Sequence, residues 1–196
     1  FRFLLAVAGR SGGSLGTPGH GRNPERQRPG VRPDRVACDF KCAGVTGVLV
    51  DMGEHRALGP QADRTPWRIG LADPQRFGAF TEILEISRGA VATSSGTQDV
   101  FDADGRYHHL FDPKKAASAD RYLSVTVTAA KATLADALST AFCAMPEPAI
   151  DRCLDGLPGV EARLIRKDGS RVVLPRRPAR RGGPVPDFVP DFVSDS

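Results

Sequence analysis

Residues 124–145 read SVTVTAAKATLADALSTAFCAM, and two different periods meet within them. SVTVTA alternates polar and apolar side chains, which predicts a strand with one buried face. TLADALSTAFCAM is built mainly of Ala, Leu, Phe, Cys and Met, which predicts an apolar helix. Its Asp136 and Thr140 stand four residues apart, so they lie on one face of that helix near its N-terminus.

This polar pair has two interpretations. A carboxylate and a hydroxyl side by side could coordinate a hard divalent cation through oxygen, with water and substrate phosphates as the other ligands. Alternatively, Asp136 favours the helix dipole in the first turn, and Thr140 bonds to the backbone carbonyl of the preceding turn. The spacing alone favours the second interpretation.

The other patterns predict helices and strands in mixed order. DRVACDFKCAGV (34–45) is typical of a helix that ends at Gly44. The predicted strands are 45–53, 67–73, 81–87 and 89–95, and two hairpins turn at Asp104-Gly105 and Asp168-Gly169. Because the elements do not alternate regularly, we expect an α+β fold with a mixed or antiparallel sheet and packed helices.

Composition divides the chain of 196 residues into three parts. Residues 1–33 are rich in Arg, Gly and Pro and are predicted to be irregular or disordered. Residues 34–174 carry the periodic patterns and are expected to form one domain. Residues 175–196 are rich in Pro and Arg and are predicted to form a flexible tail. The apolar run FRFLLAVAG (1–9) is too short to span a membrane and lacks a signal-peptide pattern.

The net charge of +4 comes from the ends of the chain. Residues 36–162 hold 17 acidic against 12 basic residues, so the predicted domain is acidic. This argues against a surface that tracks nucleic-acid phosphates. The four cysteines show no C-x-x-C spacing, which argues against a zinc site.

Three further stretches carry candidate chemistry. In RYHHLFDP (106–113), His108 and His109 point to opposite faces of a strand, so at most one lines a given site, as a general base or as a structural side chain. LVDMGEHRALG (49–59) is a strand followed by a glycine turn that contains Glu54, and its amides either hold a nucleotide or make a plain turn. The hydroxyls of AVATSSG (90–96) reach a cofactor or close a turn.

These blocks occur together in one order, and over roughly residues 34–165 that order resembles the ApbE family of FAD:protein FMN transferases. The resemblance implies that Asp136 and Thr140 bind magnesium, with Ser139 as a further ligand. The family's H-x-x-D-P block falls on His109, Asp112 and Pro113, which implies that His109 is the base. The residues that would contact FAD are Gly53, Glu54, Thr93, Ser94, Leu110 and Phe111.

The activity implied by the resemblance is protein flavinylation. FMN would pass from FAD to a Thr or Ser hydroxyl of an acceptor flavoprotein, with Mg²⁺ at the diphosphate and AMP as the leaving group. The acceptor would be a subunit of a membrane electron-transfer system, and the place of action would be the periplasm or cell envelope.

One family segment is absent from its expected place. Where members carry L-N-G-I-A-Q-G-Y, this chain has PERQRPGVRP (24–33), and the pattern resumes at Asp34. Our hypothesis is a frameshift upstream of Asp34, and we expect this chain to bind FAD weakly or not at all. Three alternatives stay open: an inactive truncated remnant, an FAD-binding or FAD pyrophosphatase module, and a binding protein that works through its Arg-rich ends.

Overall fold

The computed structural model describes residues 4–10, 31–96, 108–112 and 114–178. Its helices are α1 (Val31–Cys42), α2 (Ala132–Cys143) and α3 (Glu147–Leu154). Its strands are β1 (Leu4–Arg10), β2 (Val45–Asp51), β3 (His55–Leu58), β4 (Trp67–Ala72), β5 (Phe80–Ile86), β6 (Arg88–Ser95), β7 (Phe111–Asp112), β8 (Ala117–Ser118), β9 (Tyr122–Ala129), β10 (Glu161–Arg166) and β11 (Arg171–Leu174).

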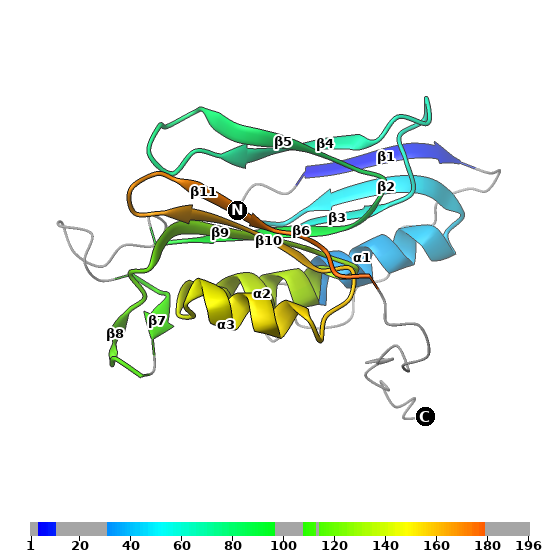
Figure 1. Ribbon diagram of the computed structural model, residues 1–196. Coiled ribbons are helices and arrows are strands. Elements are labelled where there is room, and N and C mark those ends of the chain that lie inside the picture. The colour runs from blue at the N-terminus through cyan, green and yellow to red at the C-terminus, as the bar shows by residue number, and fades with distance from the viewer. Residues whose placement is uncertain (1–3, 11–30, 97–107, 113, 179–196) are drawn as a thin grey trace.

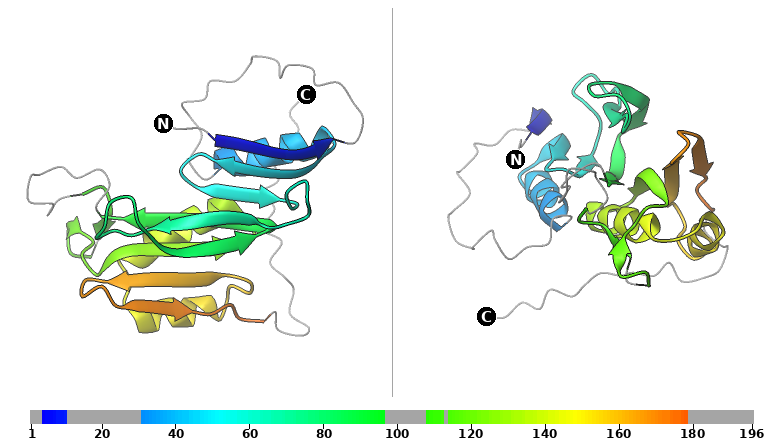
Figure 2. Two further views of the ribbon diagram at one scale, coloured as in Figure 1. Left: turned by 90° about the horizontal axis from the view of Figure 1, so that it is seen from above. Right: turned by 90° about the vertical axis from the view of Figure 1, so that its left-hand side faces the viewer.

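The main sheet has seven strands in the order β1-β2-β3-β6-β9-β10-β11. All strand pairs in the described part of the chain are antiparallel. The three helices lie on one face of this sheet, and the separate β4–β5 hairpin lies on the other face (Figures 1 and 2). The expected α+β fold with an antiparallel sheet and packed helices is therefore confirmed.

Each face of the sheet has its own core. Val125 and Val127 of β9 pack against Phe142 of α2 and Ile150 of α3, and all four side chains are buried. On the opposite face, Leu49, Ala57 and Val91 pack against the β4–β5 hairpin, where the Trp67 indole donates a hydrogen bond of 2.8 Å to the Gly59 carbonyl. The alternation along each strand thus fixes which residues face the helices.

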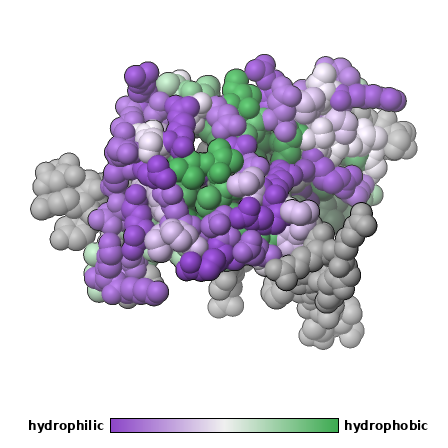
Figure 3. Space-filling view, in the orientation of Figure 1, coloured by the Kyte–Doolittle hydropathy of each residue, from purple (hydrophilic) through white to green (hydrophobic). Residues whose placement is uncertain are grey.

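The surface in the orientation of Figure 1 carries a central apolar area, in the region where that figure draws β5, β10 and β11 (Figure 3). The exposed apolar side chains on these strands are Phe80 and Ile83 of β5 and Val173 of β11. None of the helices among the described residues is long and apolar enough to cross a membrane.

Several sequence predictions are confirmed. α1 is followed by Gly44 with a φ of 80°, and the β10–β11 hairpin turns at Asp168-Gly169, where Gly169 has a φ of 82°. In that turn the Asp168 carboxylate accepts the Ser170 amide hydrogen at 2.8 Å. The hairpin predicted at Asp104-Gly105 lies outside the described residues.

The expectation that all of residues 1–33 are irregular is wrong at two places. Leu4–Arg10 form β1, which pairs with β2, and α1 already begins at Val31. The Arg, Gly and Pro content averaged over this segment concealed a seven-residue run that completes a sheet through a distant partner. β3 and α3 were not predicted either. How the chain divides into domains stays a prediction.

The N-terminus of α2 is capped from another helix. Lys131 precedes α2 and makes no side-chain cap. Instead, the Asp34 carboxylate of α1 accepts the amide hydrogens of Ala132 and Thr133, each at 2.9 Å. Arg56 of β3 places its Nε 2.8 Å from Asp34 Oδ1. One carboxylate thereby joins two helices and the sheet.

We expect Asp34→Ala to lower the free energy of unfolding by at least about 1 kcal/mol, the usual cost of removing an N-cap. The loss of the Arg56 counter-charge adds to this cost. Urea denaturation followed by circular dichroism measures the change.

The matched control is Asp39→Ala, on the same helix, because Asp39 is exposed and, among the described residues, its side chain pairs only with the exposed Arg35. An exposed pair of this kind contributes roughly 0–1 kcal/mol. Equal losses in the two variants would contradict the proposed importance of the cap.

Candidate functional site

α2 presents Asp136 and Thr140 one turn apart. The helix buries Ala132, Ala135, Ser139, Phe142 and Cys143 against the sheet. Asp136 is half-buried and Thr140 is exposed, so both lie beside the packed face and not within it. The structure thus allows the two side chains to act together, as their spacing predicts.

A chain of hydroxyl groups fixes Thr140 to the sheet. Ser94 Oγ of β6 lies 2.8 Å from Ser139 Oγ and 3.2 Å from Thr140 Oγ1, and Ser139 donates to the Asp136 carbonyl at 3.0 Å. Each hydroxyl donates a single hydrogen, so Ser94 donates to Ser139, and Thr140 donates to Ser94. The lone pairs of Thr140 therefore stay available to another group.

Ser139 is fully buried, and both of its hydroxyl interactions would have to break before its oxygen could reach a cation. Its neighbour Cys143 is also buried, and its thiol lies 3.2 Å from the Ser139 carbonyl. Burial raises the pKa of the Cys143 thiol to about 12, so it stays protonated and unreactive. Ser139 and Cys143 hold α2 against β6.

Glu54 faces Asp136 from the turn between β2 and β3. Gly53, with a φ of 104°, allows this turn. Burial, together with the nearby charges of Asp136 and Asp51, raises the pKa of the Glu54 carboxyl to about 7. Glu54 Oε2 is buried and accepts no hydrogen bond from the described residues. The site therefore contains an unsatisfied carboxyl oxygen next to a second carboxylate.

These groups form an all-oxygen set of donors. Two carboxyls and a hydroxyl suit a hard divalent cation better than a soft one. Within the described ranges, no group of three or more His, Cys, Asp and Glu side chains is placed to hold a metal ion. A cation site here would therefore rely on Thr140 as well as on the carboxylates.

The two histidines differ in exposure, since His108 is buried and His109 is exposed. The Leu110 amide donates to His108 Nδ1 at 3.3 Å, so the ring is a neutral imidazole with its hydrogen on Nε2. Burial lowers the pKa of His108. A Cβ on Gly96 would come within 2.8 Å of His108 Nε2. The His108 ring therefore packs closely against Gly96, the residue that follows β6.

The remaining predicted site residues are not all brought together. Thr93 lies on the sheet face opposite to α2, where its hydroxyl is 2.8 Å from that of Thr126. Leu110 is buried in the core with α2, whereas the Phe111 side chain is 61% exposed. The roles of these residues stay predictions.

Sequence reasoning missed Asp34 and Arg56, which hold the start of α2. The available signal was local: Lys131 stands where a helix normally has Ser, Thr, Asp or Asn. A helix with no cap of its own predicts a cap from elsewhere in the chain, but the sequence does not say from where.

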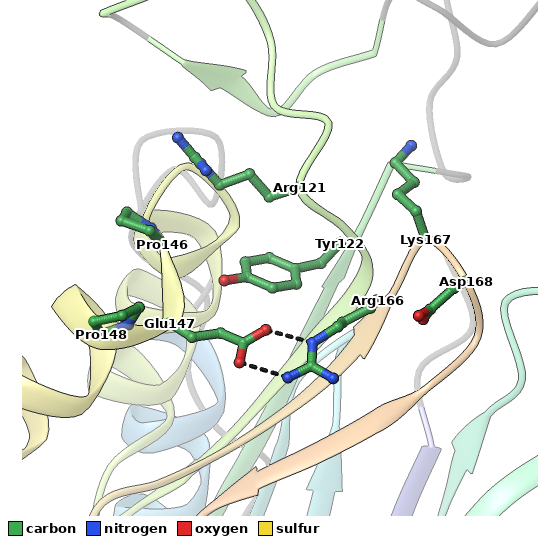
Figure 4. A pocket seen from close by; sticks show the side chains of 8 residues that line it. All are labelled: Arg121, Tyr122, Pro146, Glu147, Pro148, Arg166, Lys167 and Asp168. Carbon is green, nitrogen blue, oxygen red and sulfur yellow. Dashed lines mark hydrogen bonds and ion pairs between the residues drawn. The ribbon is translucent and has the colours of Figure 1, made fainter.

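An open pocket of about 530 Å³ lies away from these residues. It is bordered by Arg121, Tyr122, Pro146, Glu147, Pro148, Arg166, Lys167 and Asp168 (Figure 4). Glu147 and Arg166 pair through two contacts of 2.6 and 2.7 Å. None of the predicted site residues lines this pocket.

This antiparallel sheet with helices on one face matches part of a known class of enzymes, the flavin transferases. The model of the ApbE family matches residues 29–164. This chain belongs to the ApbE family. The matched region agrees with the one recognised from sequence.

Two curated relatives illustrate the match. The FAD:protein FMN transferase of Rhodobacter capsulatus is 32% identical over 174 residues, which is 85% of this chain and 33% of the relative. The FAD:protein FMN transferase of Vibrio cholerae is 36% identical over 120 residues, which is 58% of this chain and 35% of the relative. The chain spans about a third of the length of these relatives.

Solved structures of ApbE proteins match this chain as well. The ApbE protein of Thermotoga maritima superposes with a TM-score of 0.62 at 32% identity, over 73% of this chain and 48% of the other. The flavin transferase ApbE of Vibrio cholerae gives a TM-score of 0.62 at 29% identity, over 74% of this chain and 47% of the other. The fold is that of about half of an ApbE protein.

The raised pKa of Glu54 gives a testable pH dependence. The unfolded chain titrates Glu near pH 4.5 and the folded chain near pH 7, so the folded state holds this proton more tightly. The protonated Glu54 therefore contributes to the free energy of unfolding. This contribution is complete below about pH 4.5 and is lost as the pH rises through 7. Glu54→Gln should remove this loss.

Urea denaturation of wild type and Glu54→Gln at about pH 5 and pH 8, without divalent cations, measures the difference. We expect the variant to gain stability relative to wild type at the higher pH. Glu85→Gln, at an exposed position of β5, is the control. If the free energies of unfolding of wild type and Glu54→Gln differed by the same amount at both pH values, the raised pKa of Glu54 would be refuted.

Proposed function

We propose that this chain forms part of the site of an FAD:protein FMN transferase. The reaction would move FMN from FAD to a Thr or Ser hydroxyl of an acceptor flavoprotein and release AMP, with Mg²⁺ as the cofactor. Family membership supports the reaction class. The observation that carries the proposal is the convergence of Asp136, Thr140 and the unsatisfied Glu54 carboxyl.

The residues present fit a magnesium ion. Glu54 Oε2 is buried without a hydrogen-bond donor in the described part of the chain, and the neighbouring charge of Asp136 raises the Glu54 pKa. A divalent cation would remove both penalties. Because Thr140 donates its hydrogen to Ser94, its oxygen lone pairs face no competing donor from that residue. Asp136 and Thr140 would hold the ion, with Glu54 at its side.

When bound, magnesium would neutralise charge on the diphosphate oxygens of FAD. The acceptor hydroxyl oxygen would bond to the phosphorus on the FMN side, and the bond from that phosphorus to the AMP oxygen would break. His109 would take the hydroxyl proton. Its exposed position leaves it open to an acceptor protein.

Other residues would place the flavin nucleotide. Gly53 is exposed in the turn next to Glu54. The Ser94 hydroxyl is hydrogen-bonded to that of Thr140. Phe111 exposes an aromatic ring that could stack on a flavin. Leu110 would support that ring from the core. Thr93, on the opposite face of the sheet, would contribute only through the backbone of β6.

The acceptor we propose is a flavoprotein subunit of a membrane electron-transfer system, met in the periplasm or cell envelope. The relatives are FAD:protein FMN transferases, a name that supports a protein acceptor. The membrane system and the compartment are proposed from the family resemblance.

The test is covalent labelling. The purified chain is mixed with FAD, MgCl₂ and the acceptor domain of such a flavoprotein, and the acceptor is analysed by in-gel flavin fluorescence and mass spectrometry. We expect an FMN adduct that disappears with EDTA and with Asp136→Asn, because the carboxylate that would hold the cation is lost.

Asp39→Asn, an exposed position on α1, is the matched control and should label like wild type. An adduct that forms equally with Asp136→Asn would remove Asp136 from the mechanism. Release of FMN and AMP without an acceptor would instead indicate an FAD pyrophosphatase. No adduct and no hydrolysis would identify the chain as inactive.

A further inference from the structure

The start of α2 has the features of a phosphate site. The first amides of a helix have no partner within the helix, and together with the helix dipole they attract anions. In α2 the first internal bond comes from the Ala135 amide to the Lys131 carbonyl, at 3.1 Å. The amides of Ala132 and Thr133 therefore point out of the helix, close to the predicted cation ligands.

Both of these amides already donate hydrogen bonds to a side chain. Asp34 Oδ1 accepts the Ala132 amide and Asp34 Oδ2 accepts the Thr133 amide, both at 2.9 Å. The Thr133 hydroxyl adds a third bond to Oδ2, at 2.8 Å. The two oxygens of one carboxylate thus imitate two oxygens of a bound phosphate.

Arg56 holds this carboxylate in place. Its Nε lies 2.8 Å from Asp34 Oδ1, and the two side chains are only 11% and 19% exposed. The same guanidinium donates to the Gly89 carbonyl at 2.9 Å and to the Ala57 carbonyl at 3.1 Å, so it is tied to β3 and β6. A phosphate could reach the helix amides only by displacing a carboxylate that is paired and largely buried.

We propose that Asp34 is a positioning residue that closes the N-terminus of α2 to phosphate and so directs the diphosphate of the substrate to the cation. The inference rests on the proposed function, in which Asp136 and Thr140 hold that cation. Asp136 stands four residues beyond Ala132, or about 6 Å along the helix axis. The diphosphate is thereby held at the second turn and not at the first.

Asp34 has a second effect on the same site. The N-terminus of a helix carries about half a positive charge, which repels a cation bound nearby. The Asp34 carboxylate offsets that charge at the first turn. Its removal should weaken the binding of a divalent cation at Asp136 even though Asp34 itself is not a ligand.

The experiment uses Asp34→Asn, because Asn is also a good helix cap, and circular dichroism checks that the variant is folded despite the loss of the Arg56 counter-charge. The Asn oxygen still accepts one amide, but its NH₂ group leaves the other without an acceptor. NMR spectra follow the Ala132 and Thr133 amides while inorganic pyrophosphate is added without metal. We expect no response in wild type or in the control Asp39→Asn, and a saturable shift in Asp34→Asn.

A merely structural role for Asp34 would not create a new anion response in the variant. A wild-type shift at these amides, or no shift in Asp34→Asn, would overturn the inference. This arm needs no metal, so its outcome does not depend on the proposed transferase activity.

The second arm measures Mn²⁺ affinity by electron paramagnetic resonance. We expect Asp34→Asn to raise the dissociation constant several-fold, on the order of threefold to tenfold, and Asp39→Asn to leave it unchanged. Equal affinity in Asp34→Asn and wild type would refute the electrostatic effect. Wild type that binds no Mn²⁺ would count against the proposed function, while the pyrophosphate arm would still decide the role of Asp34.

Discussion

The Asp34 carboxylate and the first amides of α2 form the contact on which the other features of this molecule depend. It joins residues 98 positions apart in the chain, and Arg56 extends it into the sheet. Because α2 has no cap of its own, this contact determines where the helix begins and how its first turns face the β2–β3 turn. Asp136 and Glu54 meet as a consequence.

A second contact fixes the other end of the candidate site. Ser94 of β6 bonds to Ser139 and Thr140, so the second and third turns of α2 are tied to the sheet as the first turn is tied to α1. Between these two attachments lie the carboxyls of Asp136 and Glu54, and one Glu54 oxygen receives no hydrogen bond from the residues that the structure describes. Such a group is costly in a folded protein unless a cation or a proton compensates it. The candidate site therefore contains a carboxyl oxygen whose burial is not compensated by a hydrogen bond from the described residues.

The sequence predicted the elements that have a local periodic pattern of apolar residues. It did not predict the features that depend on residues far away in the chain. The α2 helix and the Asp136–Thr140 face follow from a 3.6-residue period. Strand alternation also separates Thr93 from Ser94, so assigning both to one site ignored a constraint that the sequence contains. In contrast, β1 exists through its pairing with β2, and β3 has only four residues, HRAL, two of them basic. The Asp34 cap joins residues 98 positions apart, so no local sequence pattern predicts it.

The position of the cation tests the central claim most directly. A crystal of the chain soaked with Mn²⁺ and FAD, measured at the manganese absorption edge, locates the ion by its anomalous signal. The account predicts one peak bound by the Asp136 carboxylate and Thr140 Oγ1, with Asp34 still on the amides of Ala132 and Thr133. A peak elsewhere, or a diphosphate seated on those amides, would contradict it.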